Sequence, residues 1–176
     1  MPKPRADYVA FIASVSEIDI ARLAAYIDGE GTIYINKTKK LYGRMKNPQY
    51  SLSLVISNTD PRLMSWLKKT FDGCVYGVKY ERCSHLGKKP IMRWQLNERL
   101  ALTVLTRCLP FMIMKREQAQ IGVEFMSLKR DRKIRSRNSL SQVLHDPLST
   151  EEISQRHAMK LEIERLNKQK HDLVIN

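Results

Sequence analysis

Residues 28–31 alternate two carboxylates with two glycines, in the order Asp28, Gly29, Glu30, Gly31. Apolar spacing predicts a helix over residues 16–28, and strict alternation predicts a strand over 32–36, so both acids lie where the helix ends. A carboxylate at the negative end of a helix is unfavourable by about 0.3 to 1 kcal/mol, so we expect a cation there. Mg²⁺ suits the position because it binds carboxylate and carbonyl oxygens, which the glycines leave exposed. A solvated turn capped by Gly31 fits the local pattern as well.

The charge of the chain indicates a polyanionic partner. Lys and Arg number 31 against 18 Asp and Glu, which gives a formal net charge of +13. Such a charge attracts nucleic acid first and anionic membranes second. No apolar run approaches the roughly 18 residues of a spanning helix, and no signal peptide is evident. We therefore expect no membrane partner and a soluble intracellular protein, in the cytoplasm or an organelle, that is not secreted.

The order of the expected elements predicts an α+β fold. The 176 residues suit one domain, with an N-terminal arm over 1–15, a core over 16–130, and a basic segment followed by a helix over 131–176. Within the core, helices are expected over 16–28, 61–71, 98–108 and 115–128, and strands over 32–36, 49–56, 75–82 and 91–96. This order predicts a four-stranded antiparallel sheet with helices on one face and a polar face left open. The last amphipathic helix is expected over 151–170.

Residues 23–31, LAAYIDGEG, resemble the nine-residue signature of the LAGLIDADG homing endonucleases. The order of elements over roughly residues 16–130 is also similar to that family's αββαββα unit. The resemblance implies a saddle-shaped sheet that lies in the DNA major groove, with the signature helices of two units packed side by side. Small side chains at Ala21, Ala25 and Gly29 form a stripe that allows such close helix packing. With Asp28, these residues are the expected dimer interface.

The resemblance also assigns the metal site. It implies that Glu30 binds a divalent metal, helped by the backbone carbonyl of Gly29, while Asp28 is more structural. Many family members carry Asp at the position of Glu30, so the longer side chain departs from the family pattern. Mg²⁺ is the expected cofactor, with Mn²⁺ or Ca²⁺ substituting for binding.

Three further positions match family roles in catalysis. Phosphodiester hydrolysis needs an activated water and cations that absorb developing charge. Asn58 ends the second strand where members often carry a glutamine that orients water, Arg62 opens the next helix within reach of the phosphate, and Lys115 resembles a lysine at the edge of the active site. Asn58 is equally well a cap or turn residue, and Arg62 is equally well a solvated surface charge, whereas for Lys115 the role at the edge of the active site is favoured over simple solvation.

The open face of the sheet supplies the expected DNA contacts, because Arg, Gln and Asn match the edges of guanine and adenine. Basic residues in the hairpin turns are expected on phosphates. The candidates are Tyr34, Asn36, Thr38, Lys40, Arg44, Gln49, Ser51 and Ser53 on the first hairpin, and Lys79, Arg82, Arg93 and Gln95 on the second.

The expected function is that of a site-specific homing endonuclease. One signature in a short chain implies a C2 homodimer with two active centres. It would bind a long pseudo-palindromic duplex DNA and hydrolyse one phosphodiester per strand, leaving 3′ overhangs as the family does. Two alternatives remain open at the level of sequence. One is a cleavage-inactive relative that acts as an intron maturase, with RNA as partner, or as a DNA-binding regulator. The other is a basic RNA-binding protein without an enzymatic site.

Overall fold

The computed structural model describes residues 5–38, 48–77, 90–130, 134–137, 143–145 and 148–169. The elements, in chain order, are α1 (Arg5–Ala13), α2 (Glu17–Glu30), β1 (Gly31–Lys37), β2 (Tyr50–Asn58), α3 (Pro61–Phe71), β3 (Cys74–Gly77), β4 (Met92–Asn97), α4 (Glu98–Cys108), a short 3-10 helix (Leu109–Phe111), α5 (Arg116–Arg130), β5 (Ile134–Arg137), β6 (Val143–His145) and α6 (Thr150–Lys168).

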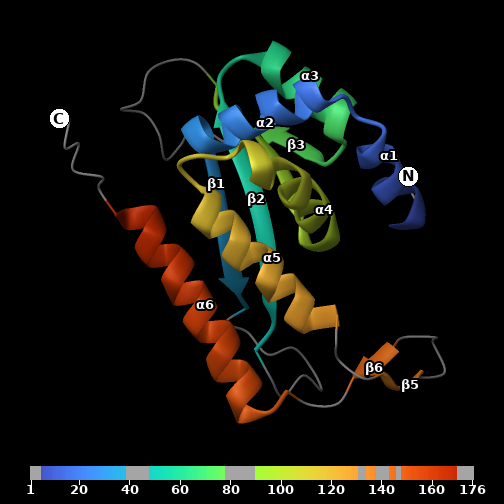
Figure 1. Cartoon of the computed structure of the whole chain (residues 1–176), viewed down its shortest axis with the longest axis vertical. Helices are drawn as coiled ribbons and strands as arrows, with labels where there is room; N and C mark the ends of the chain where they lie inside the picture. The colour runs from blue at the N-terminus through green and yellow to red at the C-terminus, as the bar shows by residue number, and fades with distance from the viewer. Residues whose placement is uncertain are drawn as a thin grey trace.

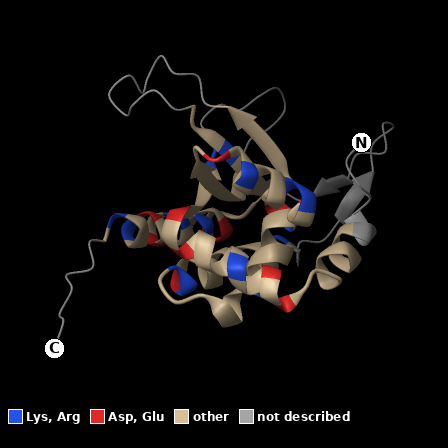
Figure 2. Cartoon of the chain, turned by 90° about the horizontal axis from the view of Figure 1, so that it is seen from above, with Lys and Arg blue, Asp and Glu red and all other residues tan. Residues whose placement is uncertain are grey.

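Strands β1 to β4 form one antiparallel sheet in the order β1-β2-β4-β3. Helices cover one face of this sheet (Figures 1 and 2). Side chains on the helix side, such as Ile33, Leu54 and Trp94, are buried, whereas alternate residues such as Tyr34 and Gln95 point the other way. The predicted α+β class, with four antiparallel strands and helices on one face, is therefore confirmed.

Helix α2 runs directly into β1, and Gly31 makes this sharp exit possible. Ser16 caps the start of α2 by accepting the backbone N–H of Asp19, and Ile20, Leu23 and Ile27 are buried along one side. At the other end, the Gly31 N–H donates to the carbonyls of Tyr26 and Ile27. A Cβ at position 31 would lie 2.7 Å from the Ile27 Cα and carbonyl oxygen, so only glycine fits.

The N-terminal segment differs from the expected arm. Residues 5–13 form α1, in which Tyr8 and Ile12 are buried one helical turn apart. The Tyr8 hydroxyl donates to the carbonyl of Phe71 at 2.8 Å, and burial raises the pKa of that hydroxyl. Arg107 donates to the carbonyls of Ala13 and Val15. These contacts come from residues far along the chain, so the local pattern of residues 1–15 did not predict the helix.

In the C-terminal part of the chain, the last helix was predicted from the sequence, and the two short strands before it were not. The expected helix over 151–170 is α6, which begins with a capping box between Ser149 and Glu152. Asn167 fastens its last turn to β1 by donating to the carbonyl of Ile33 at 2.8 Å. Within the basic segment, for which no strand was expected, the backbones of 134–137 and 143–145 pair as antiparallel strands. No helix among the described residues is long and apolar enough to cross a membrane.

Candidate active site

The two acids of residues 28–31 have opposite environments. Asp28 is 8% exposed, and its carboxylate accepts the backbone N–H groups of Ile113 at 2.7 Å and Lys115 at 2.9 Å. It thereby fastens the segment before α5 to the end of α2. Glu30, two residues later, is exposed. Asp28 thus has its oxygens occupied by its own chain, and Glu30 is the acid left open to an external ligand.

Lys115 supplies the positive charge expected at the end of α2. Its Nζ donates to the carbonyl of Ile27 at 2.9 Å and to that of Asp28 at 2.6 Å. These are carbonyls of the last turn, where the helix dipole is negative. Burial lowers the pKa of Lys115, and the Asp28 carboxylate acts in the opposite direction. The lysine is therefore a C-terminal cap of α2, and one of the carbonyls that it contacts, that of Asp28, lies two residues before Glu30 in the helix.

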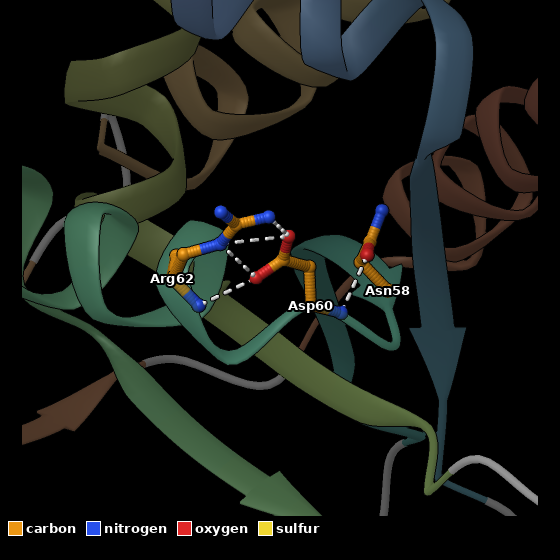
Figure 3. A network of polar contacts seen from close by, with 3 residues as sticks. All are labelled: Asn58, Asp60 and Arg62. Carbon is orange, nitrogen blue, oxygen red and sulfur yellow. Dashed lines mark hydrogen bonds and ion pairs between the residues drawn. The ribbon is translucent and has the colours of Figure 1, made fainter.

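Asn58 connects Glu30 to the start of α3. The register of β1 and β2, with Gly31 opposite Ile56, brings the end of β2 beside the end of α2. The Asn58 Nδ2 donates to Glu30 Oε2. Its Oδ1 accepts the backbone N–H of Asp60 at 2.8 Å (Figure 3). The amide orientation follows from these two bonds, since only the nitrogen can donate to a carboxylate.

Arg62 lies on the first turn of α3 and is held by Asp60. Asp60 caps the helix by accepting the Arg62 backbone N–H at 2.8 Å, and Pro61 occupies the first turn. The guanidinium of Arg62 makes an ion pair with the same carboxylate, with Nη2 2.6 Å from Oδ2 (Figure 3). Hydrogen bonds from Arg62 hold the pKa of Asp60 at about 2. The Arg62 side chain is 90% exposed, so it remains open to a ligand.

A pocket opens beside the end of α2, between β1, the start of α5 and the end of α6. Its lining is Gly31, Thr32, Met114, Lys115, Gln118, Leu166, Asn167 and Gln169. Gln118 is only 5% exposed, and its side chain makes no hydrogen bond to the part of the chain that the structure describes. Gln118 was not predicted from the sequence, because a single glutamine on a helix carries no pattern.

The described DNA-contact candidates share the open face of the sheet. Tyr34, Asn36, Ser51, Arg93 and Gln95 alternate with buried residues, and Thr38 and Gln49 extend the first hairpin, where the Thr38 N–H donates to the Gln49 carbonyl at 2.8 Å. Ser53 is on the same face but is 4% exposed, and its hydroxyl donates to Asn97. Lys40, Arg44, Lys79 and Arg82 lie outside the described residues.

Comparison with known proteins places this geometry in a known fold. No family model and no curated protein matches the chain. Among solved structures, the homing endonuclease I-CvuI, in complex with the I-CreI target, has a TM-score of 0.63 at 16% identity, over 90% of this chain and 87% of that one. The archaeal intron-encoded homing endonuclease I-Vdi141I, complexed with DNA, has a TM-score of 0.63 at 11% identity, over 88% and 87% of the two chains. The LAGLIDADG homing endonuclease I-GzeII, in complex with its DNA target, has a TM-score of 0.53 at 12% identity, over 85% of this chain and 44% of that one.

The chain has the fold of the LAGLIDADG homing endonucleases. In this LAGLIDADG fold, the signature residues 23–31 form the second half of α2 and its junction with β1.

The signature helix of this LAGLIDADG fold has an unusual outer face. Ala25 and Gly29 are exposed, Ala21 is half-buried, and Ile18 at the same side of the helix is 72% exposed. Beside the end of α2, Ile113 and Met114 are 86% and 60% exposed. Asp28 departs from the expected interface, because its carboxylate is turned inward to the segment before α5. The outer face of α2 thus combines small residues with exposed apolar side chains.

The same fold leaves Glu30 as a lone carboxylate within one chain. Among the described residues, no three His, Cys, Asp or Glu side chains gather to hold a metal ion. Mg²⁺ in proteins is usually held by one or two carboxylates together with waters and substrate phosphates. The exposed carboxylate of Glu30 is a ligand of the type that this pattern uses.

Proposed function

We propose that this chain is a site-specific endonuclease that cuts duplex DNA with the help of a divalent metal. The observation that carries the proposal is the difference between the two acids at the end of α2. The Asp28 carboxylate accepts backbone N–H groups of its own chain, whereas the exposed Glu30 accepts a hydrogen bond from Asn58. A helix end that served packing alone would not need this exposed acid, because Gly31 already provides the exit into β1.

Glu30 and the carbonyl of Gly29 are the proposed metal ligands. A divalent ion bound there supplies an activated water and stabilises charge on the scissile phosphate. Asn58 holds the Glu30 carboxylate by its N–H and so fixes the direction in which the free carboxylate oxygen points. Mg²⁺ is the proposed cofactor, with Mn²⁺ or Ca²⁺ able to support binding, and the solved I-CvuI complexes include one with Mg and one with Ca.

Lys115 and Arg62 are proposed to bind the phosphate. Two of the three Lys115 ammonium protons go to the carbonyls of Ile27 and Asp28, which leaves one donor for a ligand. Arg62 is held by Asp60 at a fixed place and exposes its guanidinium. Both side chains absorb negative charge as the phosphodiester is attacked. The pocket lined by Lys115 and Gln118 offers room for ordered water next to these two side chains.

The active form is proposed to be a C2 homodimer. One chain has one exposed Glu30, and cutting both strands of a duplex requires two such centres. Ala21, Ala25 and Gly29 on the outer face of α2 permit close approach of a second α2, and the exposed Ile18, Ile113 and Met114 give the interface apolar area. Two symmetric sheets would contact a pseudo-palindromic site, and the cuts would leave 3′ overhangs.

The test is cleavage of a randomised duplex-DNA library by the purified protein with Mg²⁺, with the ends sequenced. Defined double-strand breaks with 3′ overhangs, absent in EDTA, are the expected result. Specific binding without cutting would replace the endonuclease by a maturase or a DNA-binding regulator. Binding of structured RNA with no duplex selected would favour the basic RNA-binding protein.

A further inference from the structure

Asn97 is placed to cap a helix, yet its side chain is used elsewhere. It occupies the N-cap position of α4 with an extended backbone, φ −126° and ψ 151°, and makes no side-chain cap hydrogen bond. Asparagine is among the best N-cap residues because its side-chain oxygen accepts the free N–H groups of the first turn. The Asn97 oxygen instead accepts two hydrogen bonds on the open face of the sheet, which indicates that this face determines the residue's orientation.

The Asn97 side-chain oxygen lies at the end of a chain of side-chain hydrogen bonds. The Tyr76 hydroxyl donates to Gln95 Oε1 at 2.6 Å, and Gln95 Nε2 donates to Asn97 Oδ1 at 2.7 Å. The Ser53 hydroxyl donates to the same Oδ1, also at 2.7 Å. With two donors on its oxygen, the exposed Asn97 amide presents only its Nδ2 protons to solvent.

The location of this network suits a base contact. Asn97, the last residue of β4, pairs with Ser53 in β2, and Ser53 pairs with Tyr34 in β1, so the three residues lie on one rung of the sheet, at the end of the β2–β4 ladder. Ser53 is buried beneath its neighbours and cannot itself touch DNA, whereas Asn97 is exposed. Asn97 is therefore the member of this pair whose side chain is open to a ligand.

We propose that Asn97 determines specificity as a donor-only contact in the major groove and selects guanine over adenine. An unrestrained asparagine prefers adenine, because its oxygen accepts from N6 while its nitrogen donates to N7. With the oxygen occupied, that pair cannot form, and the remaining donors match the two acceptors of guanine, O6 and N7. The inference rests on the proposed function, since it assigns a base to the sheet that this function places on DNA.

Asn97→Asp provides a direct test. Aspartate keeps the acceptor that Ser53 and Gln95 require, and it remains a good N-cap residue, but it replaces the outward donors by an acceptor. Selection from a randomised duplex library in Ca²⁺, which needs binding but no cutting, reports the base preference at each position. The wild type is expected to select guanine, by about tenfold over adenine, at one position in each half-site. Asn97→Asp is expected to change that position to cytosine, whose N4 donates, and to leave the other positions unchanged.

Two further variants test whether the hydrogen bonds that orient the Asn97 side chain determine its base preference. Ser53→Ala removes one donor to the Asn97 oxygen without touching DNA, and it is expected to relax the guanine preference at the same position. Asn36→Asp is the matched control on the same face, because Asn36 makes no side-chain hydrogen bond to the described residues. Asn36→Asp is expected to change the base preference at a different position of the DNA site.

The outcomes distinguish the inference from the proposed function. If the wild type selects duplex sites but Asn97→Asp leaves every base preference unchanged, Asn97 has no role in specificity. An adenine at the position that responds to Asn97→Asp would equally overturn the donor-only contact. If the wild type selects no duplex at all, the proposed function itself fails, and the assignment of Asn97 with it.

Discussion

Lys115 and Asp28 bond to each other reciprocally through backbone and side chain. The Lys115 Nζ donates to the Asp28 carbonyl at 2.6 Å, and the Lys115 backbone N–H donates to Asp28 Oδ1 at 2.9 Å. The pair joins residues that are 87 positions apart, and it neutralises both the inward acid and the negative end of α2. The geometry of the proposed active site therefore depends on a contact between the signature helix and the start of α5.

Replacing Lys115 by glutamine should weaken the fold as well as the chemistry. The variant loses an ammonium group shared by two carbonyls of α2, for which we expect a decrease of about 1 to 3 kcal/mol in the free energy of unfolding. Urea denaturation measures this change. Arg116→Gln is the control, because that exposed neighbour has no hydrogen bond to the described residues and should change stability by less than about 0.5 kcal/mol. Equal stability of the two variants would contradict the capping role of Lys115.

The ion pair of Asp60 and Arg62 predicts that the stability of the folded state depends on pH in the acidic range. The pKa of Asp60 is about 2, below its ordinary value of 3.8, so the ionised carboxylate stabilises the folded state. This contribution is fully present above pH 3.8 and is lost as the pH falls through about 2. Asp60→Asn should therefore be less stable than the wild type at pH 6, and the difference should shrink below pH 3.8. Unfolding curves from pH 2 to 6 measure it, and a difference that stays constant with pH would rule out the pair as its source.

Gly31 and Gly29 should respond differently to alanine. A Cβ at residue 31 meets the Ile27 backbone at 2.7 Å, so Gly31→Ala should destabilise the chain by about 1 to 3 kcal/mol. A Cβ at residue 29 meets nothing within 4 Å in the protomer, and alanine favours a helix over glycine by about 1 kcal/mol. Gly29→Ala should consequently leave the protomer equally or more stable. Thermal unfolding of both variants checks the contrast, which fails if both lose stability alike.

The outer face of α2 predicts the assembly. Ala25 is exposed, so Ala25→Arg fits the protomer but places two cations against each other across a close α2–α2 contact. We expect this variant to sediment as a monomer and to lose double-strand cleavage, while its circular dichroism spectrum is unchanged. Gln120→Arg, on the exposed side of α5, adds the same charge elsewhere and should leave the dimer intact. If the Ala25→Arg protein were still a dimer, the dimer interface would not lie on this face of α2.

The sequence predicted those parts of the fold that depend on local pattern. The period of apolar residues placed α2, β1 and β2, and the amphipathic pattern over 151–170 placed α6. The pattern did not show that Asp28 turns inward, because the N–H groups that it accepts belong to residues 113 and 115. Nor did it show that the Asn97 side chain does not cap α4, since a residue ideal for a cap gives no sign of competing donors on β2 and β4.

Glu30 is the residue on which the proposed chemistry depends most directly. The decisive measurement compares the wild type with Glu30→Gln on a duplex chosen by library selection, at equal occupancy established by binding in Ca²⁺, with cleavage then started by Mg²⁺. Glutamine keeps the size of the side chain but removes the charge that would hold the metal. Double-strand cleavage should fall by at least about 10²-fold while duplex affinity stays close to that of the wild type. Cleavage by Glu30→Gln at the wild-type rate would contradict the assignment of Glu30 as the metal ligand.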